Sequence, residues 1–87
     1  MTHNQQAQAV IRKVWPTGLY FEHGQQVGLE LWMSGPDGQA YPVETLQDVW
    51  AVTAGQFQPG RRVSLVVDPA NPRRVIITAL LPEQSTI

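Results

Sequence analysis

The chain has 87 residues, no cysteine, and seven acidic against six basic residues, for a net charge of −1. A chain of this length builds one domain around one core, so we expect a shallow surface site rather than a deep cavity. The lack of cysteine excludes disulfides, thiolate metal sites and thiol nucleophiles. The charge balance argues against a surface built mainly to neutralise nucleic-acid phosphates. No stretch is apolar enough for a signal peptide or a membrane span, so we expect a cytoplasmic protein without membrane insertion.

The first predicted element is a long strand near the N-terminus. Residues 1–6 show no periodic pattern and are expected to form a flexible tail, and a single domain is expected over residues 7–80. Residues 7–15 are rich in β-branched residues, with apolar side chains on both sides of the strand. Such a strand would contact both halves of a closed sheet. Pro16-Thr17-Gly18 then predicts a bend or bulge, because proline lacks a backbone donor and glycine adopts unusual angles.

A hairpin is predicted in the middle of the chain. Aliphatic residues occupy every second position of residues 27–33, which is the period of a strand with one buried face. Residues 34–39, SGPDGQ, carry the proline and glycine of a turn. The return strand at residues 40–46 contains Pro42, which cannot donate a ladder hydrogen bond and therefore favours a strand edge or end.

The pattern changes after the hairpin. Leu46, Val49 and Trp50 follow one another at spacings of three or four, which predicts one or two helical turns, with Trp50 closing one end of the domain. Two more strands are predicted, at residues 61–68 and from residue 73, and residues 81–87 are expected to form a flexible C-terminal tail. Between these strands, Asp68 and Asn71 can each accept a hydrogen bond from a backbone N–H about two residues on. We therefore interpret DPANP as a structural corner rather than a metal or phosphate site.

These elements predict a mainly β protein. Five short antiparallel strands with a short helix between the third and fourth match a small OB-fold-like barrel, an architecture that binds oligonucleotides or oligosaccharides in other proteins.

A family resemblance rests on residues 7–79, and most specifically on the segment from Pro59-Gly60 to the DPANP corner. The matching positions are Ala9-x-Ile11, Thr17-Gly18, Val27-x-Leu29-x-Leu31, Gly38, Tyr41-x-Val43, Pro59-Gly60-x-x-Val63 and Val67-Asp68-Pro69-x-Asn71-Pro72-x-x-Val75. This pattern resembles a loose group of small bacterial β-barrel domains of unknown function. The resemblance implies a barrel and an interaction role, and it provides no catalytic residue.

The leading functional hypothesis is a non-catalytic protein-interaction or structural module. Trp32 occupies one of the alternate positions of its strand that are expected to face solvent. An exposed tryptophan suggests a contact surface, because aromatic residues are enriched at protein interfaces. Glu30 and Glu44 lie on the same hairpin, and no Lys or Arg occurs between residues 22 and 48. We predict that these three residues contact an unknown protein, or a second copy of the chain whose basic flanks meet the acidic hairpin. Two alternatives stay open for Trp32: cover beneath a loop or tail, and stacking on nucleic-acid bases.

The sequence leaves two other functions open. A single-stranded nucleic-acid-binding module would use Arg12, Lys13 and Arg62 near phosphates and Tyr41 or Trp32 for stacking. Arg73-Arg74 would lie about 20 Å from Arg61-Arg62, because about seven strand residues separate them. A small hydrolase is the third alternative.

The sequence offers little to support the hydrolase. His3 and His23 are expected in a tail and a loop without metal-ligand spacing, and no serine stands in a nucleophile elbow. We expect no enzyme activity, no cofactor and no metal.

Overall fold

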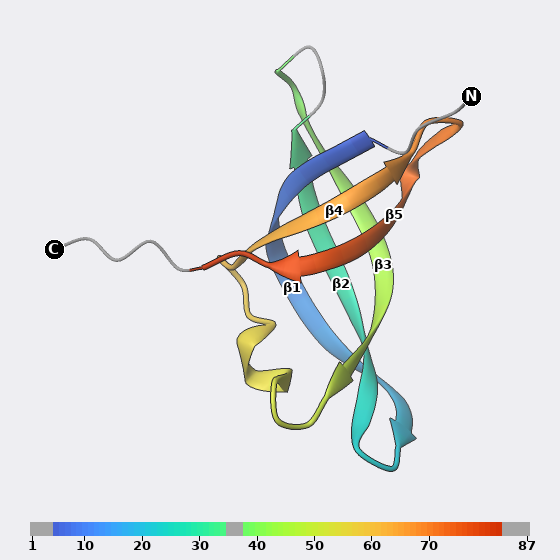
Figure 1. Ribbon diagram of the computed structural model, residues 1–87, viewed down its shortest axis with the longest axis vertical. Coiled ribbons are helices and arrows are strands. Elements are labelled where there is room, and N and C mark those ends of the chain that lie inside the picture. Colours follow the sequence, from blue (N-terminus) through green and yellow to red (C-terminus); the bar gives the residue numbers. More distant parts are fainter. Residues whose placement is uncertain (1–4, 35–37, 83–87) are drawn as a thin grey trace, which may run out of the picture.

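The computed structural model describes residues 5–34 and 38–82, which fold into one antiparallel sheet. Its strands are β1 (Gln5–Phe21), β2 (Gly24–Ser34), β3 (Ala40–Trp50), β4 (Arg62–Asp68) and β5 (Asn71–Leu80), hydrogen-bonded in the order β3-β2-β1-β4-β5 (Figure 1). The predicted mainly β, five-stranded antiparallel fold is therefore confirmed. The predicted tails lie largely outside the described residues, although β1 already begins at Gln5.

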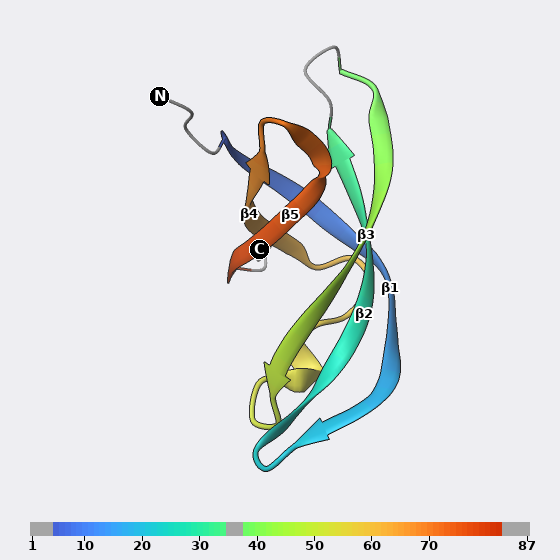
Figure 2. The same ribbon diagram turned by 90° about the vertical axis from the view of Figure 1, so that its right-hand side faces the viewer.

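β1 is the central strand and pairs on both sides. Its first six residues, Gln5 to Val10, pair with β4 and most of its length pairs with β2, so it contacts both parts of the sheet as predicted. The register with β2 is interrupted between Pro16 and Tyr20, where Gly18 has a φ of 91°. The sheet coils along this strand, so that β4 and β5 cross one side of the β1–β2–β3 layer (Figure 2).

The predicted barrel is wrong, because the sheet does not close. β3 and β5 are the two edges, and no hydrogen bond joins them into a ladder among residues 5–34 and 38–82. They come together near Tyr41, whose hydroxyl lies 3.5 Å from the carbonyl oxygen of Pro72. Pro42 follows Tyr41 in β3, and Pro72 of β5 supplies the carbonyl oxygen. Each proline removes an N–H from its strand, which weakens any ladder that would close the sheet here.

The position of Pro42 on the free edge follows from the ladder of β2 and β3. The N–H of Ala51 donates to the carbonyl of His23 at 2.8 Å, one pair beyond the end of the register. Hydrogen-bonded and non-hydrogen-bonded pairs alternate in an antiparallel ladder. The Trp32–Pro42 pair is therefore non-hydrogen-bonded, and the nitrogen of Pro42 points away from β2. The predicted edge role of this proline is confirmed.

The predicted helix after the hairpin is also wrong. Residues 46–50 continue β3, and helical structure in this region is limited to the 3₁₀ turn η1 (Ala54–Gln56). Val49 is buried, whereas Leu46 and Trp50 are 59% and 65% exposed on the other face, which is strand alternation. Trp50 does not close the end of the domain.

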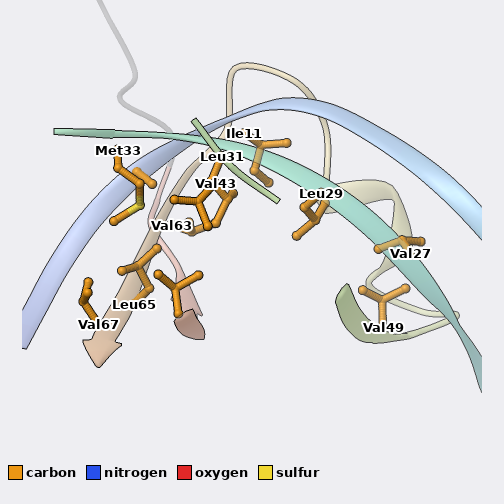
Figure 3. Close-up of a cluster of buried hydrophobic side chains, with 12 residues drawn as sticks. Ile11, Val27, Leu29, Leu31, Met33, Val43, Val49, Val63, Leu65 and Val67 are labelled. Carbon is orange, nitrogen blue, oxygen red and sulfur yellow. The ribbon is translucent and has the colours of Figure 1, made fainter. Parts of the chain in front are cut away.

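The core fills the inner side of the coiled sheet (Figure 3). It receives every second side chain of β2 and β4, together with residues of the other three strands, as the alternating pattern predicts. Its buried members are Ala9, Ile11, Val27, Leu29, Leu31, Met33, Val43, Val49, Val63, Leu65, Val67 and Val75. The even-numbered side chains of β2 and β3 consequently lie on the outer face.

Candidate functional site on the outer face

An exposed apolar row crosses the three strands of the outer face. Val10 on β1 is paired with Trp32 on β2, which is paired with Pro42 on β3. All three are exposed, and Trp32 is 38% exposed as the sequence predicts. We call this row, with the neighbouring Arg12, Glu30 and Glu44, the Trp32 face.

Arg12 lies on this face because it is two residues from Val10 on β1. The register with β2 shifts between Ile11 and Lys13, so the bulge adds Lys13 opposite Glu30 and leaves Arg12 as the extra residue. The guanidinium carbon lies 4.7 Å from the centroid of the Trp32 ring, and Nε lies 3.9 Å from Oε1 of Glu30. The face therefore contains a tryptophan and an arginine held against each other.

The two glutamates of the face lie directly opposite each other. Glu30 on β2 pairs with Glu44 on β3, an arrangement of like charges that disfavours strand pairing. On its other side Glu30 faces the cationic pair Arg12-Lys13, which offsets the repulsion. Glu44 is exposed and forms no ion pair with the described residues. One unmatched negative charge therefore borders the Trp32 face.

The residues predicted for nucleic-acid binding divide between two faces. Arg62 on β4 is paired with Val10, so it lies beside the Trp32 face with Arg12 and Lys13. Tyr41 lies instead on the inner side, packed against the core. The structure thus brings the three cations together near Trp32 and separates Tyr41 from them.

A second exposed aromatic site lies at the other end of the β1–β2–β3 layer and was missed from the sequence. Phe21 is paired with Gly24, which is paired with Trp50, so these residues form another row across the three strands. A hollow of about 230 Å³ is lined by Phe21, Gly24, Asp48, Val49 and Trp50. We call it the Trp50 slot. It was missed because Trp50 was assigned to a helix. The signal that could have found it is the two-residue spacing of Asp48 and Trp50, which is also the spacing of Glu30 and Trp32.

The remaining candidates have local roles. The Asp68 carboxylate accepts a hydrogen bond from the N–H of Ala70 at 2.9 Å, and the Asn71 side chain accepts one from the N–H of Arg73 at 3.1 Å. These bonds confirm the predicted structural corner. His23 lies 3.8 Å from Glu22 in an exposed turn, and His3 lies outside the described residues. Across residues 5–34 and 38–82 no three His, Asp or Glu side chains gather as a metal-binding group.

Comparisons of the chain with protein-family models, with curated proteins and with solved structures find no match. None of the helical structure in the described part of the chain is long and apolar enough to cross a membrane.

Proposed function

We propose that this chain is a non-catalytic protein-interaction module that binds a protein partner through the Trp32 face. The observation that carries the proposal is the stacking of Arg12 on an exposed Trp32 in the middle of an apolar row. Tryptophan and arginine are enriched among the few residues that provide most of the binding energy of an interface.

The arrangement also lowers the cost of binding. Arg12 is held by two contacts, to the Trp32 ring and to Glu30, before any partner arrives. An interface loses about 0.5–1.5 kcal/mol for each long side chain that it must immobilise, so prior ordering favours affinity. The exposed Glu44 at the border favours a partner with a basic rim.

Affinity purification with purified variants tests the proposal. The bait is the full chain, compared with Trp32→Ala and with Ile76→Ala, which truncates a residue of β5 that is 64% exposed and lies outside the Trp32 face. We expect the specifically retained proteins to be lost with Trp32→Ala and kept with Ile76→Ala. A Trp32→Ala protein of unchanged fold that retains the same proteins contradicts the proposed surface.

A second candidate is binding of single-stranded nucleic acid, favoured by the clustering of Arg12, Lys13 and Arg62 on neighbouring strands beside Trp32. Stacking on an aromatic ring with nearby cations is how sheet surfaces bind such strands. Glu30 and Glu44 on the same face oppose it. Titration with a mixed-sequence single-stranded oligonucleotide at low salt should quench tryptophan emission, less so with Arg62→Ala, and unchanged emission rejects this candidate.

We further propose that the sheet is an open relative of OB-type barrels. The strand order β3-β2-β1-β4-β5 would form a five-stranded barrel if its two edges were joined.

A further inference from the structure

The pairing of a carboxylate with a tryptophan occurs twice on the outer face. Glu30 and Trp32 are two residues apart on β2, and Asp48 and Trp50 are two residues apart on β3. Residues two apart on a strand lie on the same face. The first pair holds Arg12 between its ring and its carboxylate. The second has the same components, with Trp50 65% exposed.

A glycine stands between the two aromatic residues of the Trp50 slot. Gly24 lies between Phe21 and Trp50 in one row across three strands. At Gly28, the other glycine on this face of β2, the Trp15 indole lies over the glycine and an added Cβ would overlap it. An added Cβ at Gly24 would collide with the backbone carbonyl of Val49. The Cβ positions of both glycines are therefore blocked, at Gly28 by the Trp15 ring and at Gly24 by the Val49 carbonyl, and the hollow is the space bordered by Phe21, Asp48 and Trp50.

The charges near the slot are negative. Asp48 lines the hollow, Glu22 lies in the adjacent turn, and the sequence has no Lys or Arg from residue 14 to residue 60. Asp48 forms no ion pair with any residue that the structure describes. Within the described residues, Glu30 therefore has a cationic partner and Asp48 has none.

We propose that the Trp50 slot binds an arginine side chain of a partner protein. The guanidinium would stack on the Trp50 ring, with Phe21 on the other side of the hollow, and pair with the Asp48 carboxylate as Arg12 pairs with Glu30. Arginine fits better than lysine, because its guanidinium is planar, stacks on aromatic rings and is less strongly hydrated than an ammonium group.

The slot is a second site, separate from the Trp32 face. Gly24 and Trp32 are eight residues apart on β2, so about 26 Å lies between the two sites. The inference shares with the proposed function only the idea of a protein partner. It does not depend on the Trp32 face.

Nuclear magnetic resonance of the full ¹⁵N-labelled chain tests the slot directly, because the three tryptophans give three indole N–H signals. The probe is a blocked Gly-Arg-Gly-Arg-Gly peptide, compared with peptides that carry lysine or the neutral isostere citrulline. We expect saturable shifts centred on Trp50 with the arginine peptide, weaker binding of the lysine peptide and none of the citrulline peptide. Asp48→Asn and Trp50→Ala should each weaken binding by roughly two- to fivefold, the range for an exposed ion pair or cation–π contact. Ile76→Ala should leave it unchanged.

Three results overturn the inference. The first is an unshifted Trp50 signal at millimolar arginine peptide, and the second is an equal response to the citrulline peptide. The third is a shift of the Trp50 signal that grows with protein concentration without any peptide and is lost in Arg73→Ala or Arg74→Ala. In that case the slot binds a second copy of the chain. The two proposals fail separately. If the arginine peptide shifts the Trp50 signal while Trp32→Ala still retains the same partner proteins, the slot is supported and the Trp32 face is rejected.

Discussion

The guanidinium carbon of Arg12 lies 4.7 Å from the centroid of the Trp32 ring, although Arg12 and Trp32 belong to different strands and are not paired in the sheet register. Arg12 shares the outer face with Val10, which is paired with Trp32, so the contact follows from the register between β1 and β2. Its energy can be measured in the absence of a partner.

Replacing Arg12 by alanine should lower the free energy of unfolding by about 1 kcal/mol. The cation–π contact contributes roughly 0.5–1 kcal/mol at an exposed site, and the long, partly exposed ion pair with Glu30 adds little. Arg12→Lys should recover only part of this loss, because an ammonium group does not stack as a guanidinium does. Urea denaturation measures both, with Arg73→Ala in the exposed corner as control. Equal losses for Arg12→Ala and Arg73→Ala would show that the stacking has no energetic weight.

Gly28→Ala should destabilise the protein by about 1–2 kcal/mol, within the usual range for overpacking. The added methyl group overlaps the Trp15 indole, which must leave the sheet surface. In a Trp15→Ala background the same change should cost much less, because the two positions are coupled through this contact. Gly55→Ala is the matched control, since open space surrounds that glycine and its φ is not positive. Additive effects of Trp15→Ala and Gly28→Ala would contradict the overlap.

Period-two alternation predicted the strands well, because the inner face of a coiled sheet must be apolar at every second position. It predicted the buried face of β2 and the exposure of Trp32. The edge role of Pro42 was predicted from its missing N–H. The DPANP corner was also predictable, because Asp68 and Asn71 bond to backbone groups only two residues away. Local rules of this kind require no knowledge of distant contacts.

The prediction failed where exposed residues are apolar. Leu46 and Trp50 are both exposed, and Val49 between them is buried. Together the three apolar residues have spacings of three and four, which are those of a helix. A strand that exposes large apolar residues breaks the rule that outer positions are polar, and such breaks are expected at functional surfaces. The open sheet could not be predicted either, because closure depends on whether the edge strands β3 and β5, which are distant in sequence, pair with each other. The stacking of Arg12 on Trp32 depends on the register between β1 and β2, which alternation within a single strand does not fix.

Leu31→Ala and Leu46→Ala should differ sharply in stability. Leu31 is fully buried in the core, so its truncation should cost about 2–5 kcal/mol. Leu46 is 59% exposed on the outer face, so its truncation should change the free energy of unfolding by no more than about 0.5 kcal/mol. The two substitutions remove the same atoms, which makes each the control of the other in urea denaturation. A large loss for Leu46→Ala would favour the buried helical position that the sequence suggested.

Pro42→Val should promote association between copies of the chain. The nitrogen of Pro42 points to the free edge of β3, where valine would add an N–H and continue the row of unpaired backbone groups. Exposed strand edges pair with other strands, and prolines on an edge hinder this. Sedimentation velocity over a range of protein concentrations should show a larger dimer fraction for Pro42→Val than for the original chain. Pro59→Val, in the turn before β4, should behave like the original chain because it adds no donor to an edge strand. If Pro42→Val stays monomeric and the new amide resists hydrogen exchange, the added donor has paired with β5 instead, and the edge of β3 is then closed within the molecule.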